Sequence, residues 1–146
     1  MIAIDANLLL YAYNAEALEH KRARNWLEET FSSAPQIGLP LVSILAFVRI
    51  STDRRLSDMA HTPSQAAEIV KAWLSRENVS VLEPGSRHWE IFFENLIDTG
   101  ASGSRSADVH LAALAMEHGA TFCTNDRDFR IFPKLDVRFP LREDDV

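Results

Sequence analysis

The sequence contains little cysteine and no long hydrophobic run. Cys123 is the only cysteine among 146 residues, so no internal disulfide can form and packing must hold the fold, as is usual in a reducing cytosol. The most apolar stretch, residues 37–50, is interrupted by Pro40 and is shorter than the roughly 20 residues that cross a bilayer. Asp5 follows Met1 too closely for a signal peptide to be recognised. We therefore expect a soluble, cytoplasmic protein with no membrane partner.

Several common catalytic motifs are also missing. The chain has no Gly-rich phosphate loop, no G-x-S-x-G turn and no C-x-x-C pair. His110 and His118 flank one helical pattern, but no H-E-x-x-H or H-x-x-x-H spacing exists, so zinc is disfavoured and both are expected on the helix surface. These absences argue against P-loop nucleotide hydrolysis, serine esterase chemistry and zinc-dependent catalysis.

The chain also carries no net positive charge. The net charge is −6, which weighs against nucleic-acid binding because phosphate contacts need lysine and arginine. The objection is partial, since a cation in an acidic site would offset the local charge. Basic residues could still form binding edges, or equally a solvated mixed surface; they are Lys21, Arg22, Arg24, Arg49, Arg54, Arg55, Arg127 and Arg130.

What the chain does contain is typical of one globular domain. Hydrophobic residues make up 47% and charged residues 25%, as in average soluble domains, and the length suits a single domain spanning residues 1–146. Short apolar runs alternate with helical patterns. Strands are predicted at 2–4, 37–39, 79–82 and 121–124, and helices at 17–31, 41–50, 65–75, 90–96 and 107–118. This alternation predicts an α/β fold with a mostly parallel sheet covered on both faces.

Particular residues predict where the helices begin and end. Pro63 suits a first helical turn, and Ser86 is expected to cap the helix that contains Glu90. Ser104 or Ser106 is the expected cap of the last long helix, and Gly119 is its expected left-handed stop.

Four aspartates are the strongest chemical signal. Asp5 ends the first predicted strand, Asp108 opens an Ala/Leu-rich helix, and Asp126 and Asp128 follow the last predicted strand. Ligands of parallel sheets gather outside the carboxyl ends of the strands, so Asp5 and Asp126 should face one crevice. Clustered carboxylates are the ligands that Mg²⁺ or Mn²⁺ prefers. The pattern therefore predicts a divalent-cation site.

Each aspartate also has a purely local explanation. Asp108 would interact favourably with the dipole of its helix. Asp5 could cap a helix that follows through Ala6, Asp126 could form an Asx turn, and Asp128 could cap the turn at Phe129. The shared site is favoured because all four acids fall at element boundaries.

The remaining conspicuous residues suggest packing. Trp26, Trp73 and Trp89 lie within helical patterns and are expected in the core or at an interface. The helices around Trp26 and Trp73 offer a surface for a partner segment or for a second copy, with ordinary core packing as the alternative. Cys123 lies in an apolar strand and is expected to be inert.

Three segments together resemble the PIN-domain family: IDANLLLYA, LAFVRIST and SADVHLAALAMEHGATFCTNDRDF. More narrowly, they are similar to the VapC toxins of bacterial type II toxin–antitoxin pairs, over essentially the whole chain. The resemblance implies a three-layer sandwich around a mostly parallel sheet and an endoribonuclease activity dependent on Mg²⁺ or Mn²⁺. It also implies a homodimer and inhibition by a VapB-type antitoxin.

The same resemblance assigns roles to individual residues. It implies Asp5, Asp108 and Asp126 as metal ligands and catalytic acids, with Asp128 as a further acid, and Asn7 and Thr124 as their polar supports. One position departs from the family, because many PIN domains have glutamate where LAFVR has Ala46. That departure puts tight binding of a second ion in doubt.

The resulting hypothesis is hydrolysis of an RNA phosphodiester by metal-activated water. Arg49 or Arg127 would contact phosphate or pair with the acids. One rival is an aspartate-based phosphatase or phosphoacceptor, but such sites commonly use a nearby lysine, and none of Lys21, Lys71 and Lys134 is in an obvious late-strand position. The other rival is a weakened PIN domain that only binds RNA or its antitoxin. No sequence motif identifies which RNA is cleaved.

Overall fold

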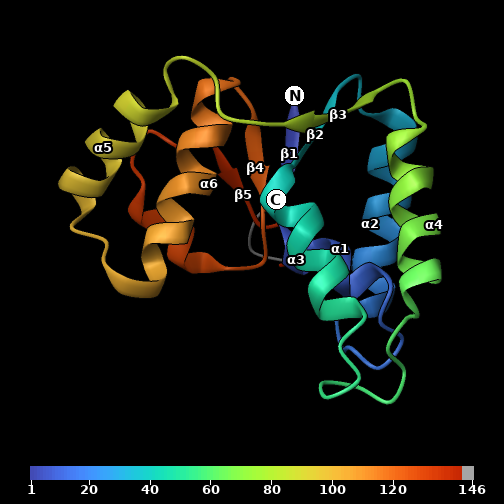
Figure 1. The fold of residues 1–146 in the computed structure, drawn as a ribbon. Coiled ribbons are helices and arrows are strands. Elements are labelled where there is room, and N and C mark those ends of the chain that lie inside the picture. The colour runs from blue at the N-terminus through green and yellow to red at the C-terminus, as the bar shows by residue number, and fades with distance from the viewer. Residues whose placement is uncertain (143–146) are drawn as a thin grey trace.

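The computed structural model describes residues 1–142, which build a five-stranded parallel sheet. The strand order is β3-β2-β1-β4-β5, so the first strand of the chain lies at the centre. Figure 1 shows helices on both sides of this sheet. The strands are β1 (Ile2–Ile4), β2 (Ile37–Pro40), β3 (Val79–Leu82), β4 (Thr121–Cys123) and β5 (Val137–Arg138).

The helices form two layers, one on each face of the sheet. α1 packs against α2 and α3, and α3 packs against α4 on one face, while α5 packs against α6 on the other (Figure 1). The helices are α1 (Ala6–Ala12), α2 (His20–Ser33), α3 (Leu41–Ser51), α4 (Pro63–Leu74), α5 (His88–Thr99) and α6 (Ser106–Glu117), with 3₁₀ turns η1 (Gly103–Arg105) and η2 (Arg127–Ile131). No helix within residues 1–142 is long and apolar enough to cross a membrane.

Two hydrophobic cores hold the layers together. The first contains Phe47 and Trp73 and packs the four helices α1, α2, α3 and α4 against one face of the sheet. The second contains Phe122 and Phe129 and joins α6 and η2 to the opposite face. Because successive strand residues point to opposite faces, Ala3 belongs to the second core and Ile4 to the first. The three-layer α/β sandwich predicted from the sequence is confirmed.

The predicted elements agree closely with the observed ones, but several details were wrong. All four predicted strands form, and Gly119 has the left-handed φ of 64° expected after α6. Ser86 does not cap α5, which begins after Arg87 without a side-chain cap. Neither Ser104 nor Ser106 caps α6: residues 103–105 form η1 instead, which leads directly into the helix. The strand β5 was not predicted because only two residues pair.

Gly38 is required by close packing within the sheet. A Cβ atom at this position would lie 2.5 to 2.8 Å from the side chain of Leu82, which is itself buried. We predict that Gly38→Ala lowers the free energy of unfolding by about 1 to 3 kcal/mol, the usual cost of overpacking a core. Urea denaturation would measure the loss. Ser80→Ala, at the exposed residue paired with Gly38 on β3, serves as the control and should change stability little.

A pair of histidines joins α5 to α6. His110 Nδ1 lies 3.0 Å from Nε2 of His88, and His88 is fully buried. His110 is half-buried against it, which corrects the expectation of a surface position. Burial lowers the pKa of both rings, and for His110 the neighbouring His88 lowers it further. The pair is therefore neutral in the folded protein at neutral pH.

This pair makes the fold sensitive to acid. As pH falls below about 6.5, histidines of the unfolded chain bind protons before the folded pair does, so the free energy of unfolding decreases. We predict that His110→Gln, which keeps a polar partner for His88, loses less stability between about pH 7.5 and 5.5 than the wild type. Thermal unfolding across this range tests the prediction, with His61→Gln as the control. An unchanged pH slope in His110→Gln would refute it.

Candidate active site

Asp5 occupies the carboxyl end of the central strand. Its backbone N–H donates to the carbonyl of Cys123 at 2.9 Å, which extends the in-register pairing of Ile4 with Cys123. The side chain is only 9% exposed and caps α1, because Oδ1 accepts the N–H of Ala6 at 2.7 Å. The local capping role anticipated from the sequence is therefore real.

Thr124 connects Asp5 to the loop after β4. Its buried hydroxyl donates to Asp5 Oδ2 at 2.7 Å and accepts from the side-chain amide of Asn7 at 3.3 Å and from the backbone N–H of Asp126 at 3.0 Å. These three bonds use the full hydrogen-bonding capacity of a hydroxyl. Asn7 also accepts the backbone N–H of Asn125 at 3.3 Å. The two residues expected to support the acids thus lie between them.

The loop after β4 carries the two later acids. Asp126 Oδ1 accepts the backbone N–H of Asp128 at 2.9 Å, the local turn that sequence reasoning offered as the alternative role. Asp128 is exposed and pairs with Arg105, whose Nη2 lies 3.2 Å from its Oδ2. Arg142 donates to the carbonyl of Asn125 at 2.9 Å, which fixes the loop from its other side.

Asp108 approaches the same place from the other helical layer. It lies in the first turn of α6 and is partly buried. Burial raises its pKa, the negative charges of Asp126 and Asp128 raise it further, and Arg105 lowers it. The fold therefore brings Asp108 close enough to Asp126 and Asp128 for their charges to shift its pKa.

Asp5 shows the same electrostatic strain more strongly. Its pKa is raised from 3.8 to about 6, because burial and, to a smaller extent, the charges of Asp108 and Asp126 outweigh the lowering by the hydrogen bonds from Thr124 and Ala6. Carboxylates at close range repel one another, and nearby positive charge reverses the sign of that interaction. A divalent cation is a chemically suitable source of this charge, because the side chains offer only oxygen ligands.

The carboxylates are not arranged as a complete coordination shell for a metal ion. Within residues 1–142, no three His, Cys, Asp or Glu side chains are grouped tightly enough to enclose a metal ion. Asp5, Asp108 and Asp126 are thus neighbours by electrostatic interaction rather than by shared coordination. Their oxygen chemistry and mutual repulsion fit Mg²⁺ or Mn²⁺.

The two arginines proposed for substrate contact lie in different places. Arg127 is the first residue of η2, between Asp126 and Asp128. Arg49 is in the last turn of α3, and its charge contributes to the lowered pKa of Asp53. The arginine that sequence reasoning missed is Arg105. Its position three residues before Asp108, where a loop becomes a helix, is the signal that could have identified it.

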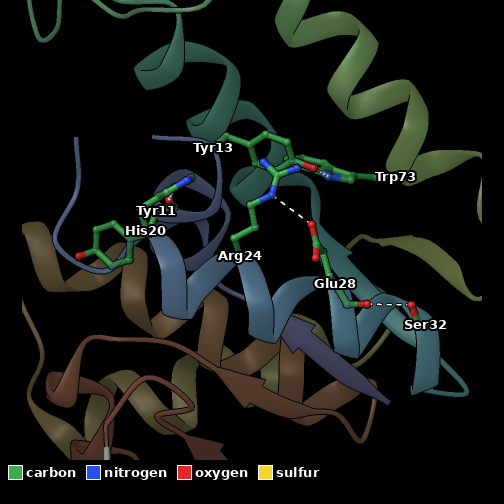
Figure 2. Close-up of polar contacts among 7 residues, drawn as sticks. All are labelled: Tyr11, Tyr13, His20, Arg24, Glu28, Ser32 and Trp73. Carbon is green, nitrogen blue, oxygen red and sulfur yellow. Dashed lines mark hydrogen bonds and ion pairs between the residues drawn. The ribbon is translucent and has the colours of Figure 1, made fainter. Parts of the chain in front are cut away.

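The core position expected for the tryptophans is confirmed for Trp73, whereas Trp89 is 61% exposed on α5 and lies outside the core. Trp73 is 2% exposed and lies in the first core, where its Nε1 donates to the hydroxyl of Tyr13 at 3.0 Å (Figure 2). Figure 2 also shows Arg24 extending between Tyr13 and Glu28, and its Nε lies 3.1 Å from Glu28. These residues line a cavity of about 450 Å³ between α2 and α4.

Cys123 is inert as expected, since burial raises its thiol pKa to about 12.

The chain is similar to known proteins over nearly its full length. The family model of the PIN domain matches residues 2–135. Ribonuclease VapC43 of Mycobacterium tuberculosis is 38% identical over 141 residues, covering 97% of this chain and 96% of the relative. Ribonuclease VapC33 of the same species is 36% identical over 143 residues, covering 98% and 100%.

Solved structures share the fold at low sequence identity. VapC20 of Mycobacterium tuberculosis, described as a toxin that cleaves the sarcin-ricin loop, superposes with a TM-score of 0.68 at 19% identity and covers 95% of this chain and 100% of its own. VapBC2 of Rickettsia felis, bound to a DNA fragment from its promoter, also gives 0.68 at 19%, covering 94% and 98%. From its sequence relatives and its family-model match, this chain belongs to the PIN-domain family and, within it, to the VapC ribonucleases.

Proposed function

We propose that this protein is the ribonuclease toxin of a VapBC-type toxin–antitoxin pair, an endoribonuclease that cleaves RNA phosphodiesters and depends on Mg²⁺ or Mn²⁺. The observation that carries the proposal is the convergence of Asp5, Asp108 and Asp126 from β1, α6 and the loop after β4, each acid close enough to affect another's ionisation. Membership of the VapC ribonucleases supplies the reaction class.

Asp5, Asp108 and Asp126 would hold the cation. When bound, Mg²⁺ or Mn²⁺ lowers the pKa of water and stabilises charge that develops on phosphoryl oxygens. Thr124 and Asn7 orient the acids, because Thr124 fixes Asp5 and the N–H of Asp126 through one hydroxyl. Rigid orientation of this kind commonly contributes 10- to 100-fold to metal affinity or activity, as an order of magnitude.

The partners and assembly follow from the same assignment. We propose inhibition by a VapB-type antitoxin, because several structural neighbours are toxin–antitoxin complexes. We also propose that the toxin forms a homodimer and that residues 1–146 are a single PIN domain, of which the last four residues lie outside the described part. The single sheet to which both cores attach supports one domain.

The phosphatase alternative has little support. A phosphoryl group on Asp5 would need a nearby lysine, but Lys71 lies 3.8 Å from Glu68 on α4 and Lys134 lies 2.7 Å from Glu94 of α5. Lys21 is exposed on α2. The binding-only alternative has one specific observation in its favour: Ala46 stands on α3 where many relatives of the family have glutamate.

Cleavage of total cellular RNA separates these functions. Purified antitoxin-free protein is incubated with RNA in Mg²⁺, in Mn²⁺ and in EDTA, and the fragments are mapped by their ends. The proposal predicts a few discrete fragments that require a metal. A folded protein that cuts nothing in either metal would overturn it and favour the binding-only alternative. Trapping of a phosphoryl group on Asp5 would favour the phosphatase.

A further inference from the structure

Arg105 lies at the edge of the acidic site and is not part of the pattern by which the family was recognised. We propose that Arg105 contacts a phosphate of the RNA beside the carboxylates, and that Asp128 acts as a positioning residue that holds its guanidinium there. This inference rests on the proposed ribonuclease function. The observed contact is the 3.2 Å ion pair between Arg105 Nη2 and Asp128 Oδ2.

The electrostatics of the site call for such a cation. Four carboxylates gather where a polyanionic RNA must approach, and the charges of Asp126 and Asp128 raise the pKa of Asp108. Arg105 acts in the opposite direction on Asp108. A guanidinium beside the acids therefore offsets part of the repulsion that an incoming phosphate meets.

The ion pair leaves Arg105 available to a ligand. Its side chain is 44% exposed and that of Asp128 is 56% exposed, and such exposed pairs contribute only about 0 to 1 kcal/mol to stability. Arg105 has five N–H donors, while the contact with Asp128 uses one nitrogen. The remaining donors suit the bidentate geometry that arginine forms with phosphate.

The position of Arg105 is set by backbone on both sides. It ends η1 and directly precedes α6, so it is fixed relative to Asp108 one turn further along the helix. Asp128 is fixed in turn, because its N–H donates to Asp126. The pair therefore links the turn before α6 to the loop after β4.

The first test measures RNA binding without metal, so that it does not depend on cleavage. A labelled single-stranded RNA of mixed sequence, about 20 nucleotides long, is titrated with wild-type protein and Arg105→Ala in EDTA from about 50 to 200 mM salt. Loss of one phosphate contact on a single strand should lower the salt slope by about 0.7, which corresponds to roughly fivefold weaker binding at 0.1 M salt. Arg105→Lys, which retains the charge, should keep the slope.

A matched control comes from a second exposed arginine pair. Arg55 is ion-paired with Asp53 at 3.0 Å on the connection between α3 and α4, and its charge is not among those that shift the pKa of Asp5 or Asp108. Arg55→Ala should bind the RNA like the wild type. Equal affinity and equal slope for Arg105→Ala and wild type, with an unchanged melting temperature, would overturn the proposed contact.

A double-mutant cycle tests the role of Asp128. Cleavage of total RNA is compared for Arg105→Ala, Asp128→Asn and the double variant in Mn²⁺. If Asp128 acts by holding Arg105, the double variant should be no slower than Arg105→Ala alone. Effects that multiply would show that Asp128 acts independently and would overturn its positioning role. Absence of wild-type cleavage would refute the proposed function, while the binding test would still decide on Arg105.

Discussion

Asp5→Asn is expected to slow RNA cleavage at least about 100-fold, since removing one charged metal ligand costs several kcal/mol of transition-state stabilisation. Asparagine keeps one oxygen that can accept the N–H of Ala6, but its amide nitrogen replaces the Oδ2 that accepts from Thr124, so one hydrogen bond is lost. The loss of activity should come mainly from the missing negative charge, with a smaller contribution from this lost bond. Fragment formation from total RNA in Mn²⁺ measures it.

The same substitution is expected to change how the stability of the metal-free protein depends on pH. Below pH 3.8 Asp5 is protonated in both states, and above about 6 it is ionised in both. Between these values the folded protein holds more protons, so the free energy of unfolding falls as pH rises, by about 3 kcal/mol in total. The Asp5→Asn variant lacks this cost but also lacks the bond from Thr124, so its stability relative to wild type should rise by about 3 kcal/mol as pH increases from 3.8 to about 6.

Thermal unfolding with and without metal tests this account of Asp5. In EDTA, the melting temperature of Asp5→Asn relative to that of wild type should rise as pH increases from about 4 to about 7. With Mn²⁺ added, the wild type should gain stability and the variant should not, because a ligand that binds only the folded state raises its stability. Asp58→Asn, at an exposed aspartate before α4, should behave like wild type throughout. A difference in melting temperature between Asp5→Asn and wild type that stays constant over this pH range in EDTA would contradict the raised pKa assigned to Asp5.

Thr124→Val is expected to reduce cleavage by about 10- to 100-fold, the usual effect of removing a partner that orients a metal ligand. Valine has nearly the shape of threonine but lacks the hydroxyl that donates to Asp5 and accepts from Asn7 and Asp126. Asp5 would lose its orienting bond, and the N–H of Asp126 would lose its acceptor. The rate of cleavage and the affinity for Mn²⁺ should fall together.

Thr124→Ser tests whether the effect of Thr124→Val comes from the lost hydroxyl or from altered packing. Serine keeps the hydroxyl and loses only a methyl group in a fully buried position, so it should retain most activity with a modest loss of stability. Thr124→Val should also lose about 1 to 3 kcal/mol of stability, because buried polar groups are left without partners. Full activity in Thr124→Val would show that the hydroxyl does not orient the acids.

Much of the fold could be predicted because local signals agreed with one another. Thr62 and Gln65 form the capping box that begins α4, and Pro63 lies in its first turn as expected. The alternation of strands with helices required a parallel sheet, and this placed Asp5 beside the end of β4 before any distance was known. The local role does not exclude the proposed shared site, since Asp5 caps α1 while it interacts electrostatically with Asp108 and Asp126.

Other features depend on which layers meet, which sequence periodicity does not encode. His88 and His110 are far apart in the chain, and only the packing of α5 on α6 brings Nδ1 of His110 to 3.0 Å from Nε2 of His88. The contact between Arg105 and Asp128 likewise joins η1 to η2. The caps of α5 and α6 were mispredicted because a turn leads into each helix, and the sequence preference of serine for N-cap positions does not reveal such a turn.

The central claim is that Asp5, Asp108 and Asp126 together hold one catalytic cation, and direct measurement of Mn²⁺ binding tests it without knowledge of the RNA. Electron paramagnetic resonance of antitoxin-free protein titrated with Mn²⁺ gives the number of bound ions and their affinity. The account predicts one ion per chain in the wild type and in Asp58→Asn, with binding strongly weakened in Asp5→Asn and Asp108→Asn. Binding that is absent in the wild type, or unchanged in both aspartate variants, would contradict it.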